Sequence, residues 1–143
     1  MVQLVEDKLD LDTYLELRES VHFHRLSRDQ ARKGLDNSLY TLVAYLDGRA
    51  VGMGRIVGDG AIICYVQDLI IRPEVQGKGI GGLILETLKE FVINEGYPGT
   101  MMMFDLMCAR GRERFYKKHG FIARPTETLG PGMIQYLEIP DKI

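Results

Sequence analysis

The chain has 143 residues, 45% of them hydrophobic, and a formal net charge of −2 at pH 7. This length is enough to build one core without disulfide or metal staples, so we expect a single domain over residues 1–143. The nearly balanced charge argues against a basic surface for nucleic acid or for an anionic membrane. Cys64 and Cys108 are the only cysteines. Their separation is unlike that of a zinc or redox pair, so we expect both to be reduced core residues.

The sequence has no basic and apolar leader and no apolar run of about 20 residues. We therefore expect a cytoplasmic protein with no membrane partner. The sequence leaves open whether the chain forms a homodimer.

Two helices are expected first. Residues 11–19 carry apolar side chains at helical spacing. Ser27 and Gln30 have the spacing of a capping box, which predicts a second helix toward Leu35. His22 and His24 lie between the two helices, and without a third ligand they predict no metal site.

Strands are expected at residues 38–46, 49–57 and 61–71, with a hairpin turn at Asp47-Gly48. Beyond them, we expect a helix that ends near Glu95, a strand at 100–106, a helix at 111–119 and a last strand at 133–139. This order predicts a mixed α/β (α+β) fold. Its central twisted sheet is mixed, largely antiparallel in the first half and flanked by helices.

The most informative segment is residues 66–85, in which an apolar strand runs through a short turn into four glycines and then an amphipathic helix. Such a loop places bare backbone N–H groups at the positive end of a helix dipole, where phosphate oxygens bind. The absence of a Cβ allows close approach and positive φ angles. The residues of this predicted phosphate cradle are Gln76, Gly77, Lys78, Gly79, Ile80, Gly81 and Gly82.

A dinucleotide-binding loop is the alternative reading of the same glycines. Gly77, Gly79 and Gly82 satisfy the G-x-G-x-x-G spacing, and Asp105 follows about 20 residues later. Against this, residues 72–75 separate the strand from the glycines, and the motif lies in the middle of a short chain. A plain surface turn would need only one glycine.

The spacing Gln76-x-x-Gly79-x-Gly81, after Arg72-Pro73-Glu74, resembles the coenzyme A loop of the GNAT superfamily of acyl-CoA N-acyltransferases. A second segment, residues 115–121 (FYKKHGF), resembles the FYxKxGF motif of that superfamily. Two motifs in the family's order are much more specific than either alone. The resemblance covers residues 38–139 and implies the GNAT fold, with acetyl-CoA as cosubstrate and no metal.

The resemblance also implies roles for the strand before the loop. Leu69, Ile70 and Ile71 would pair through their backbone with the pantetheine arm of the coenzyme. A bulge in this strand would free an amide for the thioester carbonyl, where a preorganised donor stabilises the developing oxyanion.

Tyr116 is the first catalytic candidate, because the family places this tyrosine near the coenzyme sulfur, where its hydroxyl can serve the leaving thiolate. A tyrosine packed as core between Phe115 and Phe121 is the other reading. Many family members have Asn seven residues before the tyrosine, whereas this chain has Ala109. That departure puts one contact to the pantetheine arm in doubt.

Asp68 is the second candidate, since an acid within an apolar strand needs an explanation. The pair Gln67-Asp68 resembles the Glu-Asp of glucosamine-6-phosphate N-acetyltransferases, in which the acid sits by the reacting amine. Asp68 would then orient an ammonium group and take its proton directly or through water. An exposed acid on an edge strand is the other reading.

Together these features predict an N-acetyltransferase that moves an acetyl group from acetyl-CoA to the primary amine of a small molecule by direct attack. A non-catalytic acyl-CoA-binding or sensor module is the alternative from another class. The basic run at residues 110–118 is expected to be a solvated helix face rather than a contact to the coenzyme. The sequence does not encode the identity of the acceptor in any readable way.

Overall fold

The computed structural model of the chain describes residues 1–141. They belong to two compact units, Met1–Leu106 and Met107–Ile143. The first unit contains all five strands and the three longest helices, and the second contains one short helix.

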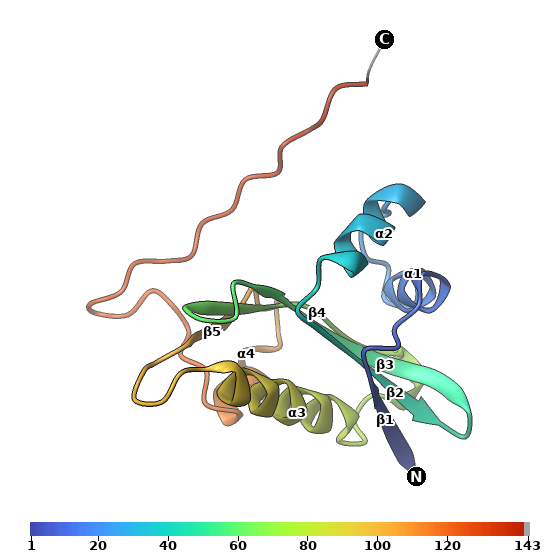
Figure 1. The fold of residues 1–143 in the computed structure, drawn as a ribbon, viewed down its shortest axis with the longest axis horizontal. Coiled ribbons are helices and arrows are strands. Elements are labelled where there is room, and N and C mark those ends of the chain that lie inside the picture. Colours follow the sequence, from blue (N-terminus) through green and yellow to red (C-terminus); the bar gives the residue numbers. More distant parts are fainter. Residues whose placement is uncertain (142–143) are drawn as a thin grey trace. The chain divides into compact units, whose positions relative to one another are not determined.

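The first unit is built on a five-stranded sheet in the order β1-β2-β3-β4-β5 (Figure 1). The first three pairings are antiparallel, and β5 pairs with β4 in parallel. The strands are β1 (Val2–Glu6), β2 (Tyr40–Leu46), β3 (Arg49–Gly58), β4 (Ile63–Ile71) and β5 (Met103–Leu106). The predicted mixed sheet is confirmed. The alternative of a dinucleotide-binding loop is wrong, because that fold requires a doubly wound parallel sheet.

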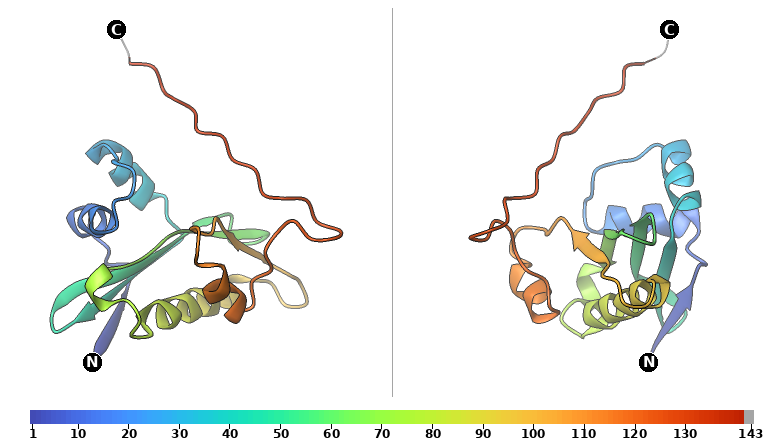
Figure 2. Two further views of the ribbon diagram at one scale, coloured as in Figure 1. Left: turned by 180° about the vertical axis from the view of Figure 1, so that it is seen from behind. Right: turned by 60° about the vertical axis from the view of Figure 1, so that its left-hand side comes forward.

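Helices cover both faces of this sheet (Figure 2). Helices α1 (Leu11–Ser20) and α2 (Arg28–Asp36) lie over one face, and α3 (Ile80–Glu95) packs against the other. Ser27 forms the predicted capping box with Gln30 at the start of α2. A short 3-10 helix, η1 (Pro73–Val75), connects β4 to the glycine loop before α3.

Two apolar clusters follow from this layering. The larger one, between the sheet and α3, contains Ile80, Ile84 and Leu88 of the helix. The smaller one, under α1, joins Tyr14 and Leu17 of the helix to Met53 and Ile70 of the sheet, among others. Helix α3 approaches β3 closely, because a Cβ on Gly54 would lie 2.8 Å from methyl carbons of both Ile84 and Leu88.

Strand β1 was not expected from the sequence. Its five residues pair in register with β2, from Val2 opposite Leu46 to Glu6 opposite Leu42. Val2 and Leu4 pack against the larger apolar cluster. The strand forms because the edge of β2 and a core surface are available to it. Both are tertiary features, which cannot be predicted from the five residues themselves.

The second unit contains α4 (Glu113–Lys118) and a long C-terminal segment. The strand expected at residues 133–139 is wrong, since residues 121–141 contain no helix or strand. Met133 and Tyr136 are almost fully exposed. An apolar pattern predicts which face of a strand is buried, but a strand also needs a neighbour for its backbone groups.

Two further observations concern the whole described chain. Of the helices in residues 1–141, none has the length and apolar character that a bilayer crossing requires. Cys64 is buried as expected, whereas Cys108 is exposed, so the expectation that both cysteines are core residues is wrong for Cys108.

Candidate active site

A bulge in β4 is the first feature of the candidate site. Arg55 of β3 pairs with Asp68, but the next residue, Ile56, pairs with Val66. Gln67 is therefore an extra residue on β4 and is exposed. The family resemblance implied a bulge in the strand of residues 69–71, and in the structure the bulge lies at Gln67, just before them. A bulge of this kind leaves one residue outside the ladder and turns the strand locally.

The second half of β4 has a free edge. Strand β5 pairs only with Ile63 to Val66 of β4. In the described chain no strand follows on that side of residues 67–71. Leu69, Ile70 and Ile71, predicted to pair with a pantetheine arm, lie on this stretch. An unpaired strand edge presents alternating N–H and C=O groups that an extended, amide-containing ligand can bond.

The glycine loop begins directly after this edge. The Gln76 side chain donates a hydrogen bond to the Ile71 carbonyl over 2.9 Å, which fixes the loop to the end of β4. Gly77 and Gly79 have φ angles of 82° and 83°. A Cβ on either would meet nothing within 4 Å, so glycine is required here by the backbone angle and not by crowding.

The loop ends in the first turn of α3, which has no side-chain cap. Leu83 is the first residue of this helix whose N–H finds an acceptor, the Gly79 carbonyl. Within residues 1–141, none of the amides of Gly77 to Gly82 donates to a protein acceptor. Six unbonded N–H groups and the positive end of a 16-residue helix together form an anion-binding site.

The side chains of Lys78 and Ile80 point into different surroundings, one into solvent and the other into the core. The Lys78 side chain is exposed, so it can add a mobile positive charge to the cradle. The Ile80 side chain is buried in the apolar cluster under α3, so only its amide faces the loop. The side chain of Ile80 therefore anchors the helix start to the core.

Asp68 is the centre of a buried polar network on the face of the sheet that α1 and α2 cover, opposite to the α3 face. Its side chain is 1% exposed. One carboxylate oxygen accepts from the Tyr14 hydroxyl at 2.7 Å and from Nε of Arg55 at 3.0 Å. The other accepts from Arg18 at 2.9 Å. The reading of Asp68 as an exposed edge acid is therefore wrong. Burial, followed by the nearby Asp68 charge, raises the pKa of Tyr14.

The same network reaches the loop between α1 and α2. Arg18 also donates to the His24 carbonyl at 2.8 Å, and its guanidinium lies over the rings of Tyr14 and Phe23. Arg55 also donates to the carbonyl of Gly34 in α2. Asp68 thus fixes both helices and their loop to β3 and β4. With three donors already bonded, its carboxylate retains little capacity for a substrate ammonium group.

Tyr116 lies on α4, within the second unit. Its ring makes edge contacts with Phe115 and Phe121, at centroid distances of 5.1 Å and 5.7 Å. Burial raises the pKa of Tyr116 to about 12. The phenol therefore stays protonated throughout the neutral range.

The remaining predicted features are exposed. His22 and His24 are both exposed, as are most side chains of residues 110–118. No three His, Cys, Asp or Glu side chains gather into a metal-binding group anywhere in residues 1–141.

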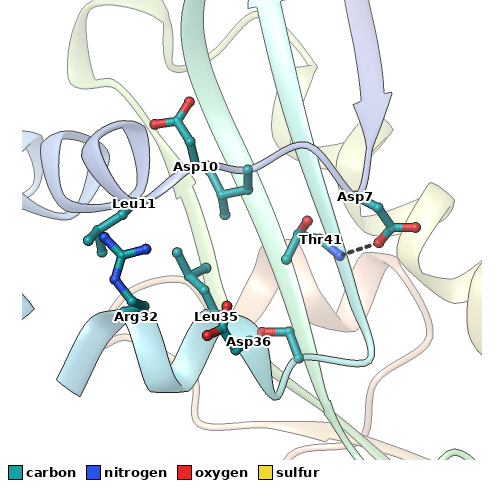
Figure 3. Close-up of a pocket in the computed structure, with 9 residues that line it drawn as sticks. Asp7, Asp10, Leu11, Arg32, Leu35, Asp36 and Thr41 are labelled. Carbon is teal, nitrogen blue, oxygen red and sulfur yellow. Dashed lines mark hydrogen bonds between the residues drawn. The ribbon is translucent and has the colours of Figure 1, made fainter. Parts of the chain in front are cut away.

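A separate cleft of about 370 Å³ lies between the β1–α1 connection and α2 (Figure 3). Asp7, Asp10 and Asp36 contribute carboxylates to it, and Arg32 contributes the opposite charge. Asp10 already caps α1 through the Thr13 amide, and Asp7 accepts from the Thr41 amide. None of the predicted site residues lines this cleft.

Comparison with known proteins gives a consistent result. The model of the family described as "Acetyltransferase (GNAT) domain" matches residues 37–123. Serotonin N-acetyltransferase 2, chloroplastic, of Oryza sativa subsp. japonica is 31% identical over 126 residues, which are 85% of this chain and 61% of the rice protein. The chain spans less than two thirds of the length of the curated relatives it matches.

Solved structures resemble the chain over most of its length. A probable acetyltransferase of unknown function from meticillin-resistant Staphylococcus aureus has a TM-score of 0.82 and 31% identity, covering 95% of this chain and 100% of its own. A GNAT-family acetyltransferase from Streptococcus pneumoniae has a TM-score of 0.80 and 26% identity, covering 96% and 98% respectively.

The phosphate cradle predicts the effect of Gly81→Val. Gly81 lies in the first turn of α3, where valine is compatible with folding, but the branched side chain would crowd the free amides. We expect coenzyme A binding to be lost by titration calorimetry, with the thermal melt retained. Gly96→Val, at the other end of α3 where φ is −70°, is the matched control. Similar affinities in the two variants would contradict the cradle.

The Asp68 network predicts a large loss of stability for Asp68→Ala. The change leaves two nearly buried guanidinium groups without their carboxylate, which costs about 3–5 kcal/mol in comparable sites. Asp12→Ala removes the exposed Arg28–Asp12 pair instead and should cost less than about 1 kcal/mol. Urea unfolding of both variants measures the difference, and equal small losses would show that the network does not stabilise the fold.

Proposed function

Because the chain belongs to the GNAT family of acetyltransferases, we propose that it transfers an acetyl group from acetyl-CoA to the primary amine of a small molecule. The observation that carries the proposal is the run of unbonded amides from Gly77 to Gly82 beside the free edge of β4. Pyrophosphate binds such amides, and a pantetheine arm binds such an edge. The acetyl-CoA thioester would then lie near the bulge at Gln67.

In this proposal the amine attacks the thioester directly. The backbone amide freed by the bulge donates to the developing oxyanion. Neither cysteine is suited to form an acyl-enzyme, because the pKa of both is raised and their thiolates are disfavoured. Burial raises the pKa of Cys64, and partial desolvation together with the nearby Glu113 charge raises that of the exposed Cys108. The chain would need only to hold the two substrates, stabilise the oxyanion and manage protons.

Tyr116 serves the leaving thiolate in this mechanism. Full transfer of its proton is unfavourable, since a phenol with a pKa of about 12 and a thiol near 8.5 differ by roughly 5 kcal/mol in acidity. A hydrogen bond that strengthens as charge builds on sulfur fits these values better. Asp68 holds α1, α2 and their loop in place, and this loop would line the acceptor side.

The acceptor class is the finer part of the proposal. The rice relative is named for serotonin and is 31% identical over 85% of this chain. We therefore place arylalkylamines such as serotonin first among the acceptors to test. We keep the cytosol as the expected compartment, because Cys108 is a free, exposed thiol.

The deciding experiment combines binding with turnover. We expect acetyl-CoA to bind by calorimetry, and thiol release to follow when serotonin, tyramine, spermidine or glucosamine 6-phosphate is added. Binding without turnover across this panel would favour an acyl-CoA sensor module. Failure to bind acetyl-CoA would contradict both readings.

Tyr116→Phe tests the role at the thiolate. The ring contacts with Phe115 and Phe121 should survive, so acetyl-CoA affinity and melting temperature should not change. We expect kcat to fall by about 10²- to 10⁴-fold. Since the pKa of Tyr116 is raised to about 12, the wild type should show no alkaline decline from this group between pH 7 and pH 10. A kcat within about twofold of wild type would mean that water protonates the sulfur.

A further inference from the structure

Asp105 of β5 carries a buried carboxylate oxygen that lacks a partner. Of the buried side-chain nitrogen and oxygen atoms in the described chain, its Oδ1 is the one without a hydrogen bond. Such an atom is costly in a folded protein and is rare unless it has a use. The proposed function, as stated above, gives Asp105 no role.

The position of Asp105 in the sheet places its carboxylate close to the bulge in β4. Asp105 pairs in register with Tyr65, and Val66 opposite Leu106 is the last pair before β4 and β5 separate. Gln67, the bulge residue, follows Val66 directly. The carboxylate therefore lies within about two residues of the point where the thioester carbonyl would sit, or roughly 7 Å along the strand.

The face on which Asp105 lies is also informative. Phe104 and Leu106 pack against the apolar cluster under α3, so alternation turns Asp105 to the other face. That is the face on which Tyr14 and Asp68 meet and over which α1 and α2 lie. The two carboxylates thus share one face of adjacent strands. Asp68 is bonded to three donors, whereas Oδ1 of Asp105 has none.

We propose that Asp105 is the group that receives the ammonium of the acceptor and takes its proton. This inference rests on the proposed function. One ammonium proton passes to Asp105, and the free amine attacks the thioester carbonyl. The C–N bond forms and the C–S bond breaks. The second nitrogen proton goes to the departing thiolate, which leaves as coenzyme A, and Asp105 then releases its proton to solvent.

The electrostatics of the site agree with this role. Burial raises the pKa of Asp105, and only the amide of its own residue opposes that rise. The titratable group opposite Asp105 on β4 is Tyr65. The Cys64 thiol lies on the other face of the sheet, and its pKa is raised by burial, with a minor contribution from the charge of Asp105. A carboxylate with a raised pKa is a stronger base than an ordinary one and is better matched to an amine substrate.

The test is Asp105→Asn, assayed with serotonin and acetyl-CoA by thiol release. Wild-type kcat/KM for serotonin should rise with pH through one carboxyl ionisation. The variant should lose that acidic limb and fall by about 10²- to 10⁴-fold, with acetyl-CoA affinity unchanged. Asp105→Glu should recover part of the rate. The control is Asp47→Asn, an exposed hairpin carboxylate at φ 51°, an angle that asparagine tolerates.

Thermal melting separates this role from a structural one. A raised carboxyl pKa means that the ionised form destabilises the fold at neutral pH. This cost decreases as the pH falls through the folded-state pKa and is gone below the unfolded-state value of about 3.9. Asp105→Asn should therefore melt higher than wild type at pH 7, and the difference should be much smaller near pH 4. Lost turnover together with higher stability supports the proposal. An unchanged rate and pH profile, or a lower melting temperature at pH 7, would overturn it.

A second measurement does not depend on turnover. The carboxyl-carbon resonance of Asp105, assigned with the Asn variant, should titrate above the ordinary aspartate value of about 3.9. A value at or below this would overturn the inference. If no amine in the panel is acetylated, the proposed function fails, and this titration still decides whether Asp105 is a buried base.

Discussion

One extra residue in β4, Gln67, determines which side chains of this strand face α3 and which face α1. Before Gln67, Cys64 and Val66 face the cluster under α3; after it, Leu69 and Ile71 do. If residues 64–71 alternated regularly with no bulge, Asp68 would share the face of Cys64 and Val66 in the apolar core under α3, where a carboxylate has no partner. With the bulge, Asp68 faces α1 and pairs with Arg18 of that helix and Arg55 of β3. The bulge therefore makes a charged residue compatible with a buried strand.

The same insertion links the two sides of the site. On one side, β4 leaves β5 after Val66 and runs along a free edge into the glycine loop. On the other, Asp68 holds the first two helices through contacts that are short and nearly dry. A buried pair of this kind adds little net stability compared with apolar packing, but it specifies one arrangement. In the proposed function, that arrangement would shape the acceptor side of the site.

Features that depend on short spacings were readable from the sequence. The glycine loop, the capping box at Ser27 and the hairpin at Asp47-Gly48 each rest on a few adjacent residues whose backbone needs are specific. The Asp68 network was not readable, since Arg18 lies 50 residues away in sequence and Arg55 lies 13. Asp105 shows the same limit. Its spacing after the glycines fitted only the dinucleotide-binding alternative, and the sheet topology showed which face it occupies.

The open amides of the cradle have a consequence for how the free protein behaves in solution. Most amides of α3 are bonded within the helix, and those on its buried face exchange with solvent only when the structure opens. Those from Gly77 to Gly82 have no acceptor to shield them. A sharp boundary between fast and slow deuterium uptake should therefore fall at Leu83, the first residue bonded back to Gly79. The six cradle amides should therefore exchange fast, directly before a helix whose buried amides exchange slowly.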